Sequence, residues 1–231
     1  MRLEGRIALV TGASRGLGAA VAKRYAAEGA QVILVARKRE KLEQVDDAIQ
    51  KAGGQATLVP LNLREFDQID QMAAALRQRF GRIDILTSCA AALGNLAPVG
   101  HYDVPLWQEV MEVNCTANWR LIRALAPLLH ASPTGRAIFT TCAAAREATP
   151  FWGAYAASKA ALESMVRIYA AENIQSSLRV NLVDPGPLGT ELRFAAFPFE
   201  DRTVLKSPDD ATEAFVTLAE AGCTQHGALI A

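Results

Sequence analysis

The chain alternates short runs of apolar residues with longer segments in which apolar residues recur at helical spacing. The runs have strand length and are apolar throughout, without the alternation of polar and apolar positions that a half-exposed strand shows. We therefore expect strands that are buried on both faces, as in a parallel sheet. The predicted strands span residues 6–11, 31–36, 56–61, 83–87, 136–141 and 178–183, with 228–230 as a short seventh.

The segments between these runs predict amphipathic helices, several of which end at glycine. They span residues 16–28, 37–52, 66–80, 104–129 and 153–173, and Pro208 begins a last helix. On the second of them, the spacing of Leu42, Val45, Ile49 and Ala52 predicts the buried face. Asp103 is the expected N-cap of the long fourth helix, since its carboxylate can accept from the first free N–H groups.

This alternation predicts one doubly wound α/β domain over residues 1–231, a Rossmann-like fold with a mostly parallel sheet of six to seven strands and helices on both faces. No linker, low-complexity segment or shift of composition divides the chain. In such folds ligands bind along the carboxyl ends of the strands. Candidate chemistry is therefore expected in the segments that directly follow a strand.

Charge and composition exclude several classes of partner. The 231 residues contain 24 Lys and Arg against 24 Asp and Glu, so we expect no nucleic-acid partner, because phosphate binding needs a basic surface. The sequence predicts no membrane span and no signal peptide. The four scattered cysteines predict free thiols in a cytoplasmic protein. His101, His130 and His226 are too far apart in the sequence to indicate a metal site.

The turn between the first strand and the first helix carries three glycines spaced G-x-x-x-G-x-G. Glycines allow a tight turn and a close approach of the backbone to a pyrophosphate, which then lies on the helix N-terminus. The alternative is that they only make a turn, and three glycines at this junction favour phosphate binding. The expected cofactor contacts are Gly12, Ser14, Arg15, Gly16, Leu17 and Gly18.

The residues after the second strand indicate which dinucleotide binds. NAD-binding folds place an acid there, to accept from the adenosine ribose, whereas this chain has Ala36 followed by Arg37. Together with Arg15 in the glycine loop, Arg37 predicts two guanidinium groups that converge on a 2′-phosphate. We therefore expect NADP(H) in preference to NAD(H). The alternative is that Arg37 is the solvated start of a helix.

Tyr155 and Lys159 lie four residues apart, on one face of a predicted helix. Alone, this Y-x-x-x-K spacing is common as a chance surface pair. In combination with the glycine loop, with Asn114, and with the segment from Asn181 through Pro185-Gly186 to Thr190, it resembles the short-chain dehydrogenase/reductase family. The resemblance extends over nearly the whole chain from Leu3 to the C-terminal region.

The resemblance implies an acid–base mechanism. Tyr155 gives a proton to a carbonyl oxygen in reduction or takes one from an alcohol in oxidation. Lys159 lowers the pKa of the tyrosine and holds the nicotinamide ribose, and Asn114 anchors a water on the proton path. Cys142 stands at the position of the family's catalytic serine.

The resemblance also implies further contacts to the cofactor. The segment after the sixth strand corresponds to the family's contacts with the nicotinamide carboxamide and the pyrophosphate, and the pair after the third strand to its adenine contacts. Ala90 belongs to a segment after the fourth strand that the family also places at the cofactor. These expected contacts are Asn62, Leu63, Ala90, Pro185, Gly186, Leu188 and Thr190.

Two departures from the family pattern concern activity. The thiol of Cys142 is a weak donor and does not reproduce a serine hydroxyl's hydrogen bond to substrate. Thr141 is not expected to replace it, because neighbouring strand residues point to opposite faces. The alternative is that Cys142 is a small buried hydrophobe. The second departure is Ser88-Cys89-Ala90-Ala91, where the family has Asn-Asn-Ala-Gly, so that Cys89 lacks an amide and Ala91 adds a Cβ.

Aromatic residues near the expected site predict a partly apolar substrate. Trp152 lies three residues before Tyr155, and Phe194, Phe197 and Phe199 lie where the family has its variable substrate lid. The alternative is that these side chains cover the core.

A homodimer or homotetramer is expected, as family members commonly pair through the helix that carries Tyr155. That helix presents Leu162, Met165, Val166 and Tyr169, more apolar surface than one sheet face needs. The alternative is that all four pack on their own sheet.

Two functions remain open. One is an NADP(H)-dependent oxidoreductase that acts on a small-molecule carbonyl or secondary alcohol. The other is a cofactor-binding protein with little or no turnover, in a regulatory or structural role. Intact Asn114, Tyr155 and Lys159 favour the enzyme, whereas Cys142 and Cys89 favour the second function.

Overall fold

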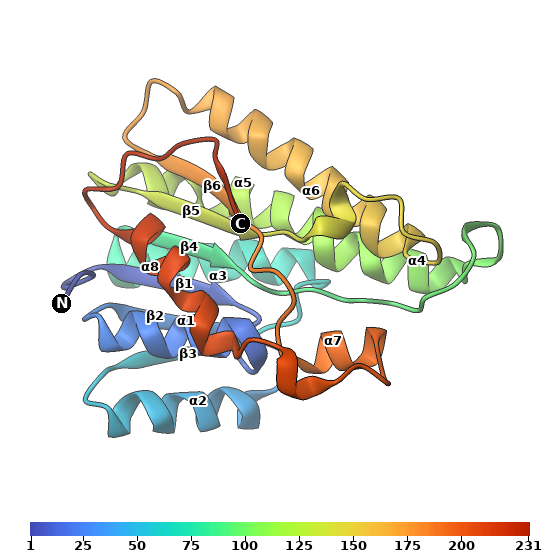
Figure 1. The fold of residues 1–231 in the computed structure, drawn as a ribbon. Helices are drawn as coiled ribbons and strands as arrows, with labels where there is room; N and C mark the ends of the chain where they lie inside the picture. The colour runs from blue at the N-terminus through green and yellow to red at the C-terminus, as the bar shows by residue number, and fades with distance from the viewer.

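A computed structural model describes all 231 residues and contains one sheet of seven parallel strands (Figure 1). Their order is β3-β2-β1-β4-β5-β6-β7, so the topological switch point lies between β1 and β4, where such folds bind ligands. The strands are β1 (Ile7–Thr11), β2 (Gln31–Ala36), β3 (Ala56–Pro60), β4 (Ile85–Ser88), β5 (Arg136–Thr140), β6 (Arg179–Val183) and β7 (Leu229–Ile230).

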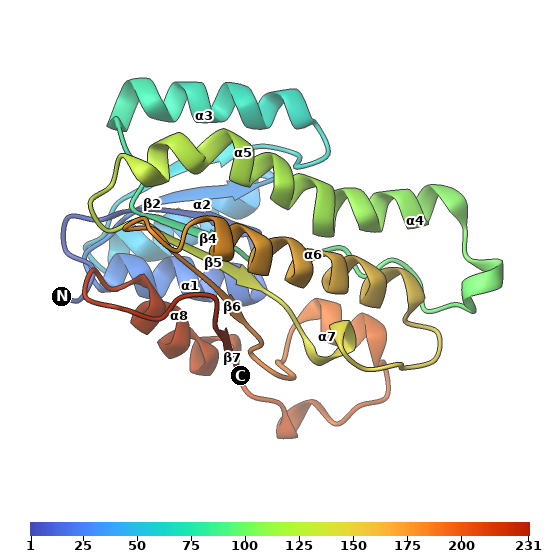
Figure 2. The same cartoon turned by 90° about the horizontal axis from the view of Figure 1, so that it is seen from above.

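Helices cover both faces of the sheet. One core packs side chains of α3, α5 and α6 on the sheet and the other packs those of α1, α2 and α8, and Figure 2 shows α3, α5 and α6 on the side opposite α1 and α8. The helices are α1 (Gly16–Ala27), α2 (Arg39–Lys51), α3 (Phe66–Phe80), α4 (Val104–Met111), α5 (Ala117–His130), α6 (Gly153–Glu172), α7 (Glu191–Ala196) and α8 (Thr212–Ala219).

The continuous apolar character of the strands has a direct physical reason. In β1, Ile7 and Leu9 belong to the core under α3, α5 and α6, while Ala8 and Val10 belong to the opposite core. Each face of the strand is buried, so neither set of alternate positions can be polar without a cost in desolvation. The doubly wound α/β fold predicted from the sequence is confirmed.

The long helix predicted at 104–129 is interrupted. Asp103 caps α4 as expected, with its Oδ1 accepting from the N–H of Leu106 at 2.9 Å. Residues Glu112–Thr116 then form one π-helical turn before α5 begins. A π turn inserts an extra residue into a helix without breaking the apolar periodicity strongly, which is why the sequence pattern did not reveal it.

Smaller differences lie at element ends. Ala52, expected on the buried face of the second helix, is exposed just beyond the end of α2. The strand predicted from 83 begins at Ile85, and Pro208 opens a 3-10 turn from which α8 follows at Thr212. The six-residue helix α7 was not predicted at all. None of the helices combines the length and the apolar character that crossing a bilayer requires.

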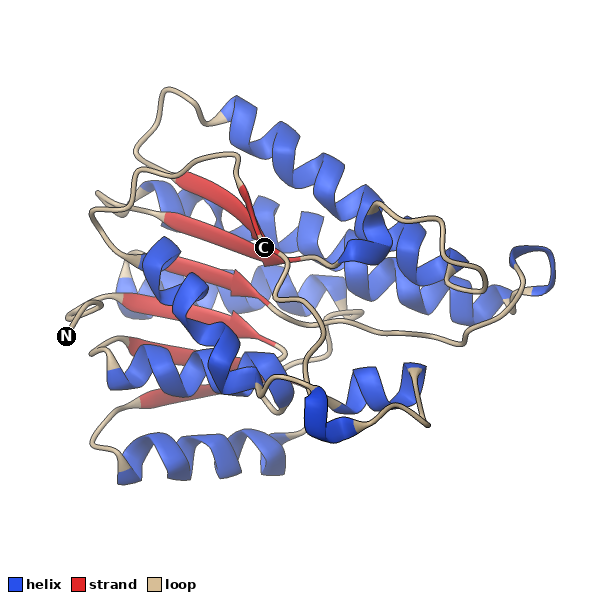
Figure 3. Ribbon diagram, in the orientation of Figure 1, coloured by secondary structure: helices blue, strands red, loops and turns tan.

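The strands all point toward the side of the molecule where α4 and α7 lie (Figure 3). The segments that follow β1, β4, β5 and β6 therefore meet at one edge of the sheet. Most of the predicted cofactor-binding residues lie in these segments.

Candidate active site

The glycine loop after β1 is closed so tightly that two of its positions admit no side chain. Gly12 has φ +67°, and a Cβ there would lie 2.8 Å from the backbone nitrogen of Ala90. A Cβ on Gly18 would lie 2.7 Å from the carbonyl carbon of Gly12. The N–H of Ala90 also donates to Thr11 Oγ1 at 3.3 Å. The loop after β1 is thus pressed against the segment after β4 at the switch point.

The N-terminus of α1 fits an anion. Arg15 occupies the N-cap position and provides no side-chain acceptor. The N–H groups of Gly16, Leu17 and Gly18 have no acceptor within the protein, because the first turn of a helix lacks preceding carbonyl groups. Such free N–H groups at the positive end of a helix dipole suit a phosphate. The side chain of Ser14 is half-buried beside them.

The two arginines predicted to converge on a 2′-phosphate, Arg15 and Arg37, differ in their surroundings. Arg37 follows β2 and is exposed, next to the half-buried Ala36. Arg15 is exposed too, but it forms an ion pair with Glu191, the first residue of α7. The guanidinium of Arg15 is therefore engaged by a carboxylate that the sequence did not indicate as its partner.

Asn62 and Leu63, which follow β3, differ in burial. Asn62 is half-buried, and its Oδ1 accepts from the N–H of Arg64 at 3.3 Å. The side chain of Leu63 belongs to the core under α3, α5 and α6. Of Leu63, only the backbone is placed to meet a ligand.

Tyr155 and Lys159 lie buried on one face of α6, with 7% and 3% exposure. The ammonium nitrogen of Lys159 donates to the carbonyl of Thr140 at 2.8 Å, and lies 5.9 Å from the centroid of the Tyr155 ring. The pair thus faces the carboxyl end of β5 and is not a chance surface pair.

Burial sets the protonation of this pair. Desolvation raises the pKa of the Tyr155 phenol, with Cys142 and Asp184 adding to the increase. The same burial lowers the pKa of Lys159. Both shifts disfavour the charged form, so the protein alone keeps Tyr155 as a phenol that has a proton to donate.

Asn114 lies in the π-helical turn and is completely buried. Its amide nitrogen donates at 2.9 Å both to the carbonyl of Ala92 and to Ser158 Oγ, and its Oδ1 accepts from the N–H of Ala92 at 2.8 Å. Its backbone carbonyl accepts from Asn118 Nδ2 at 2.8 Å. Both amide hydrogens are used, so only the remaining lone pairs of its carbonyl oxygens are available to hold a water.

Cys142 follows β5 and is half-buried, and it is among the groups that raise the pKa of Tyr155. Thr141 is buried and donates its hydroxyl to Glu163 Oε1 at 2.7 Å. Thr141 therefore points away from Tyr155 and does not replace the missing serine, as expected from the alternation of strand residues.

The segment after β6 reaches the glycine loop. Leu188 is buried and pairs with Lys206. Thr190 caps α7 by accepting from the N–H of Arg193 at 3.3 Å, and its Cγ2 would lie 3.4 Å from a Cβ on Gly16. Pro185 and Gly186 form the turn between β6 and this contact. The predicted cofactor-binding residues from four separate segments thus meet at one edge of the sheet.

Comparison with known proteins agrees with this geometry. The sequence model of the family described as short chain dehydrogenase matches residues 6–200. The oxidoreductase YciK of Escherichia coli K12 is 40% identical over 219 residues, which cover 94% of this chain and 86% of that protein. The chain belongs to the short-chain dehydrogenase family. It is accordingly an oxidoreductase that acts on CH–OH groups.

Solved structures of the family are very similar to this dehydrogenase. The structure of YciK from E. coli has a TM-score of 0.95 at 38% identity, covering 99% of this chain and 95% of that one. A crystal structure of a short-chain dehydrogenase from Shigella flexneri 2a, in complex with NADP, has the same TM-score and identity and covers 99% and 97%.

The cysteine after β4 retains a link between strands in this dehydrogenase. Cys89 Sγ accepts from Thr140 Oγ1 at 3.4 Å, and burial raises the pKa of the thiol to about 11. Cys89 therefore stays protonated at neutral pH. It joins the segment after β4 to β5, although it lacks the amide that the family has at this position.

An aromatic cluster adjoins Tyr155. The Trp152 ring lies edge-on to Tyr155 with centroids 5.7 Å apart and packs on Phe197 at 5.6 Å. Phe194 lies under the guanidinium of Arg202, and Phe199 is fully exposed. Of the three phenylalanines expected in a lid, only Phe197 is thus joined to the site through Trp152.

The apolar surface predicted for pairing on α6 is not free. Leu162, Val166 and Tyr169 are buried in the core of their own sheet, and Met165 packs against it. This part of the sequence analysis was wrong, because the sheet face is wide enough to cover all four. The exposed apolar residue of α6 is instead Ile168.

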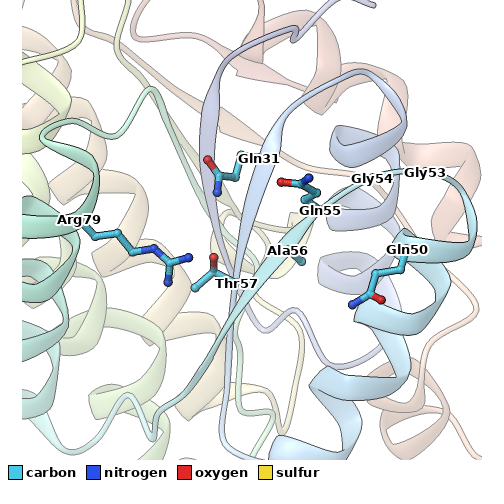
Figure 4. Close-up of a pocket in the computed structure, with 8 residues that line it drawn as sticks. All are labelled: Gln31, Gln50, Gly53, Gly54, Gln55, Ala56, Thr57 and Arg79. Carbon is cyan, nitrogen blue, oxygen red and sulfur yellow. The ribbon is translucent and has the colours of Figure 1, made fainter.

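A surface hollow of about 480 Å³ lies elsewhere (Figure 4). It is found where β2 and β3 begin, at the sheet edge opposite the catalytic residues, and amide side chains dominate it. Its lining residues are Gln31, Gln50, Gly53, Gly54, Gln55, Ala56, Thr57 and Arg79. No group of three or more His, Cys, Asp or Glu is arranged to hold a metal ion.

Proposed function

We propose that this dehydrogenase uses NADP(H) to interconvert a small-molecule carbonyl and a secondary alcohol, with Tyr155 as the general acid and base. The observation that supports it most strongly is the burial of Tyr155 beside Lys159 and Cys142, at the sheet edge where the glycine loop lies. Fold alone does not establish such a reaction, whereas a buried phenol next to a buried ammonium group is an arrangement suited to proton transfer.

Tyr155, Lys159 and Asn114 have different roles in the proposed reaction. When bound, NADP(H) supplies or accepts the hydride. In reduction Tyr155 donates its proton to the carbonyl oxygen. In oxidation it must accept one, so the pKa that burial raises above the ordinary value of a phenol has to fall toward neutral pH when the cofactor is bound. The positive charge of Lys159 lowers the pKa of Tyr155, and its ammonium group orients the nicotinamide ribose. Asn114 anchors a water on the proton path.

The cofactor preference rests on the segment after β2. The chain offers no carboxylate there to the adenosine ribose, and Arg37 is exposed and unpaired, so a 2′-phosphate gains a charge-assisted partner. The free N–H groups of α1 suit the pyrophosphate. The NADP complex of the similar Shigella protein supports NADP binding.

A second function is favoured by one residue. Cys142, which acts on the pKa of Tyr155, stands where the family has a serine hydroxyl, and a thiol is a weak hydrogen-bond donor. A cofactor-binding member with little or no turnover would have this arrangement. The experiment that separates the two functions is NADPH consumption over a broad panel of carbonyl compounds, with NADPH binding measured in parallel. Binding without consumption of any carbonyl would favour the second function.

We also propose that the enzyme is a cytoplasmic homodimer or homotetramer. Its four cysteines are unpaired, as in a reducing compartment. Trp119 on α5 and Ile168 on α6 keep about half of their surface exposed, at 48% and 56%, and aromatic residues such as tryptophan are enriched at protein interfaces. A monomeric mass by light scattering at micromolar concentration would contradict the oligomer.

A further inference from the structure

One arginine contacts two of the segments that build the proposed active site and belongs to a third. Arg146 directly follows the short 3-10 turn Ala143–Ala145 that begins at Cys142. Its guanidinium forms an ion pair with Glu163, one turn beyond Lys159 on α6. It also donates to Asp184 Oδ2 at 2.5 Å, in the residue that precedes Pro185.

The two carboxylates that Arg146 contacts are buried, each with about 8% of its side chain exposed. Each also holds backbone or side-chain groups of the site. Asp184 Oδ1 accepts from the N–H of Gly186 at 3.1 Å, which shapes the turn after β6. Glu163 Oε1 accepts from the Thr141 hydroxyl next to Cys142 at 2.7 Å. The positions of Cys142 and of the Pro185-Gly186 turn are therefore coupled through Arg146.

The carboxylates differ in what else compensates their charge. Glu163 has a second cation, Arg167, with an N–O distance of 3.6 Å. Asp184 has no cationic partner other than Arg146. A buried carboxylate without a cation is strongly unfavourable and acts on every ionisable group around it.

The ionisable groups around the Tyr155 phenol come from three elements. Cys142, in the segment after β5, and Asp184, in the segment after β6, both raise the pKa of the phenol, and the ammonium nitrogen of Lys159 lies 5.9 Å from the ring centroid. The charges of Cys142, Cys89, Asp184 and Glu163 act on Lys159 in turn. Asp184 is the only carboxylate among the groups that act on the phenol, and Arg146 is the cation that holds it.

We propose that Arg146 is a positioning residue of this dehydrogenase, which joins three segments of the active site and neutralises Asp184 behind Tyr155. It touches neither the phenol nor the cofactor loop, and it acts through Asp184 and Glu163. The proposal rests on the proposed function of Tyr155 as acid and base. It adds a requirement that the family pattern of Asn114, Tyr155 and Lys159 does not contain.

The sign of the effect follows from charge. Without Arg146, the negative charge of Asp184 is uncompensated and disfavours the phenolate, so the pKa of Tyr155 rises. Oxidation of an alcohol requires Tyr155 to accept a proton, so the acidic limb of its pH–rate profile moves to higher pH. For Arg146→Gln we expect a displacement of about one pH unit, which corresponds to about 1.4 kcal/mol.

The test compares four variants of the full chain, each checked for an unchanged circular dichroism spectrum. Arg146→Gln displaces the profile, and Arg146→Lys, which keeps the charge, stays near the wild type. The double variant Arg146→Gln with Asp184→Asn returns toward the wild type, because the uncompensated charge is gone. The matched control is Arg167→Gln, which removes the other cation from Glu163 but none from Asp184, and it leaves the profile in place.

A second measurement does not require turnover. The phenolate absorbance of Tyr155 is titrated with and without NADP⁺ as the difference between each protein and the same protein carrying Tyr155→Phe. In Arg146→Gln the Tyr155 signal is expected at higher pH. If the wild type oxidises no alcohol while this shift is present, the proposed function fails and the role of Arg146 stands. An unshifted phenolate in Arg146→Gln, or an equal shift in Arg167→Gln, would overturn the role of Arg146.

Discussion

Replacing Cys142 by serine is expected to raise the turnover of this dehydrogenase. Cys142 is among the groups that act on the Tyr155 phenol, so we expect a serine hydroxyl at the same place to reach the oxygen on which Tyr155 acts. The neighbouring Thr141 hydroxyl donates to Glu163 at 2.7 Å. Thr141 is thus not free to supply the bond.

The magnitude follows from the kind of hydrogen bond that is gained. A neutral hydrogen bond contributes about 0.5–1.5 kcal/mol, whereas a positioned donor to a developing oxyanion contributes up to about 4 kcal/mol. Cys142 is only half-buried, and partial solvation weakens a hydrogen bond. We therefore expect about 1.5 kcal/mol, a gain of about tenfold in kcat.

The assay is NADPH oxidation with the most reactive carbonyl of a panel, at saturating cofactor. NADPH binding should be unchanged, because Cys142 lies outside the glycine loop. Cys142→Ala is expected to be no faster than the wild type, and Cys223→Ser, a half-buried cysteine near α8, is the matched control. If Cys142→Ser and Cys142→Ala have the turnover of the wild type, the residue does not contact the reacting oxygen and the reasoning fails.

Four further substitutions test other parts of the molecule. Tyr155→Phe should abolish turnover and leave NADPH binding nearly intact, whereas Lys159→Ala should lower both; turnover that survives Tyr155→Phe would exclude this residue as the acid. Arg37→Asp should weaken NADPH binding about tenfold (~1.5 kcal/mol) with little change for NADH, measured by fluorescence titration, and equal loss for both cofactors would contradict a 2′-phosphate contact. Arg136→Met should destabilise the fold by about 2–4 kcal/mol in urea unfolding, because the guanidinium donates to the carbonyls of Glu220, Ala221 and Cys223 at 2.6–3.0 Å. Burial lowers the pKa of Arg136 to about 10. The control for Arg136→Met is Arg123→Met, which replaces an exposed arginine and is expected to unfold like the wild type.

Much of the fold could be predicted because it depends on local pattern. A strand buried on both faces must be apolar at every position, and β1 divides its residues between the two cores accordingly. The glycine loop could also be predicted, because Gly12 and Gly18 lie so close to other backbone atoms that no side chain fits there. Tyr155 and Lys159 share a helix face whatever the remainder of the chain does.

The rest depended on which distant segments meet. Periodicity indicated that Leu162, Val166 and Tyr169 lie on an apolar face, but the extent of the sheet decided that they are buried in the monomer. Nothing local distinguishes the π-helical turn at Asn114 from regular helix, and its place follows from bonds to Ala92 and Ser158.

Sequence alone therefore determined the class of fold, the glycine-rich turn after β1 and the Tyr155–Lys159 pair, since each arises within one short segment. Only the tertiary structure decided the partners of the charged side chains. Arg15 pairs with Glu191, and Arg146 joins Glu163 to Asp184, across 176, 17 and 38 positions of the chain. An ion pair depends on the distance between two groups in space and on their burial, and neither quantity is encoded in the pattern around either residue.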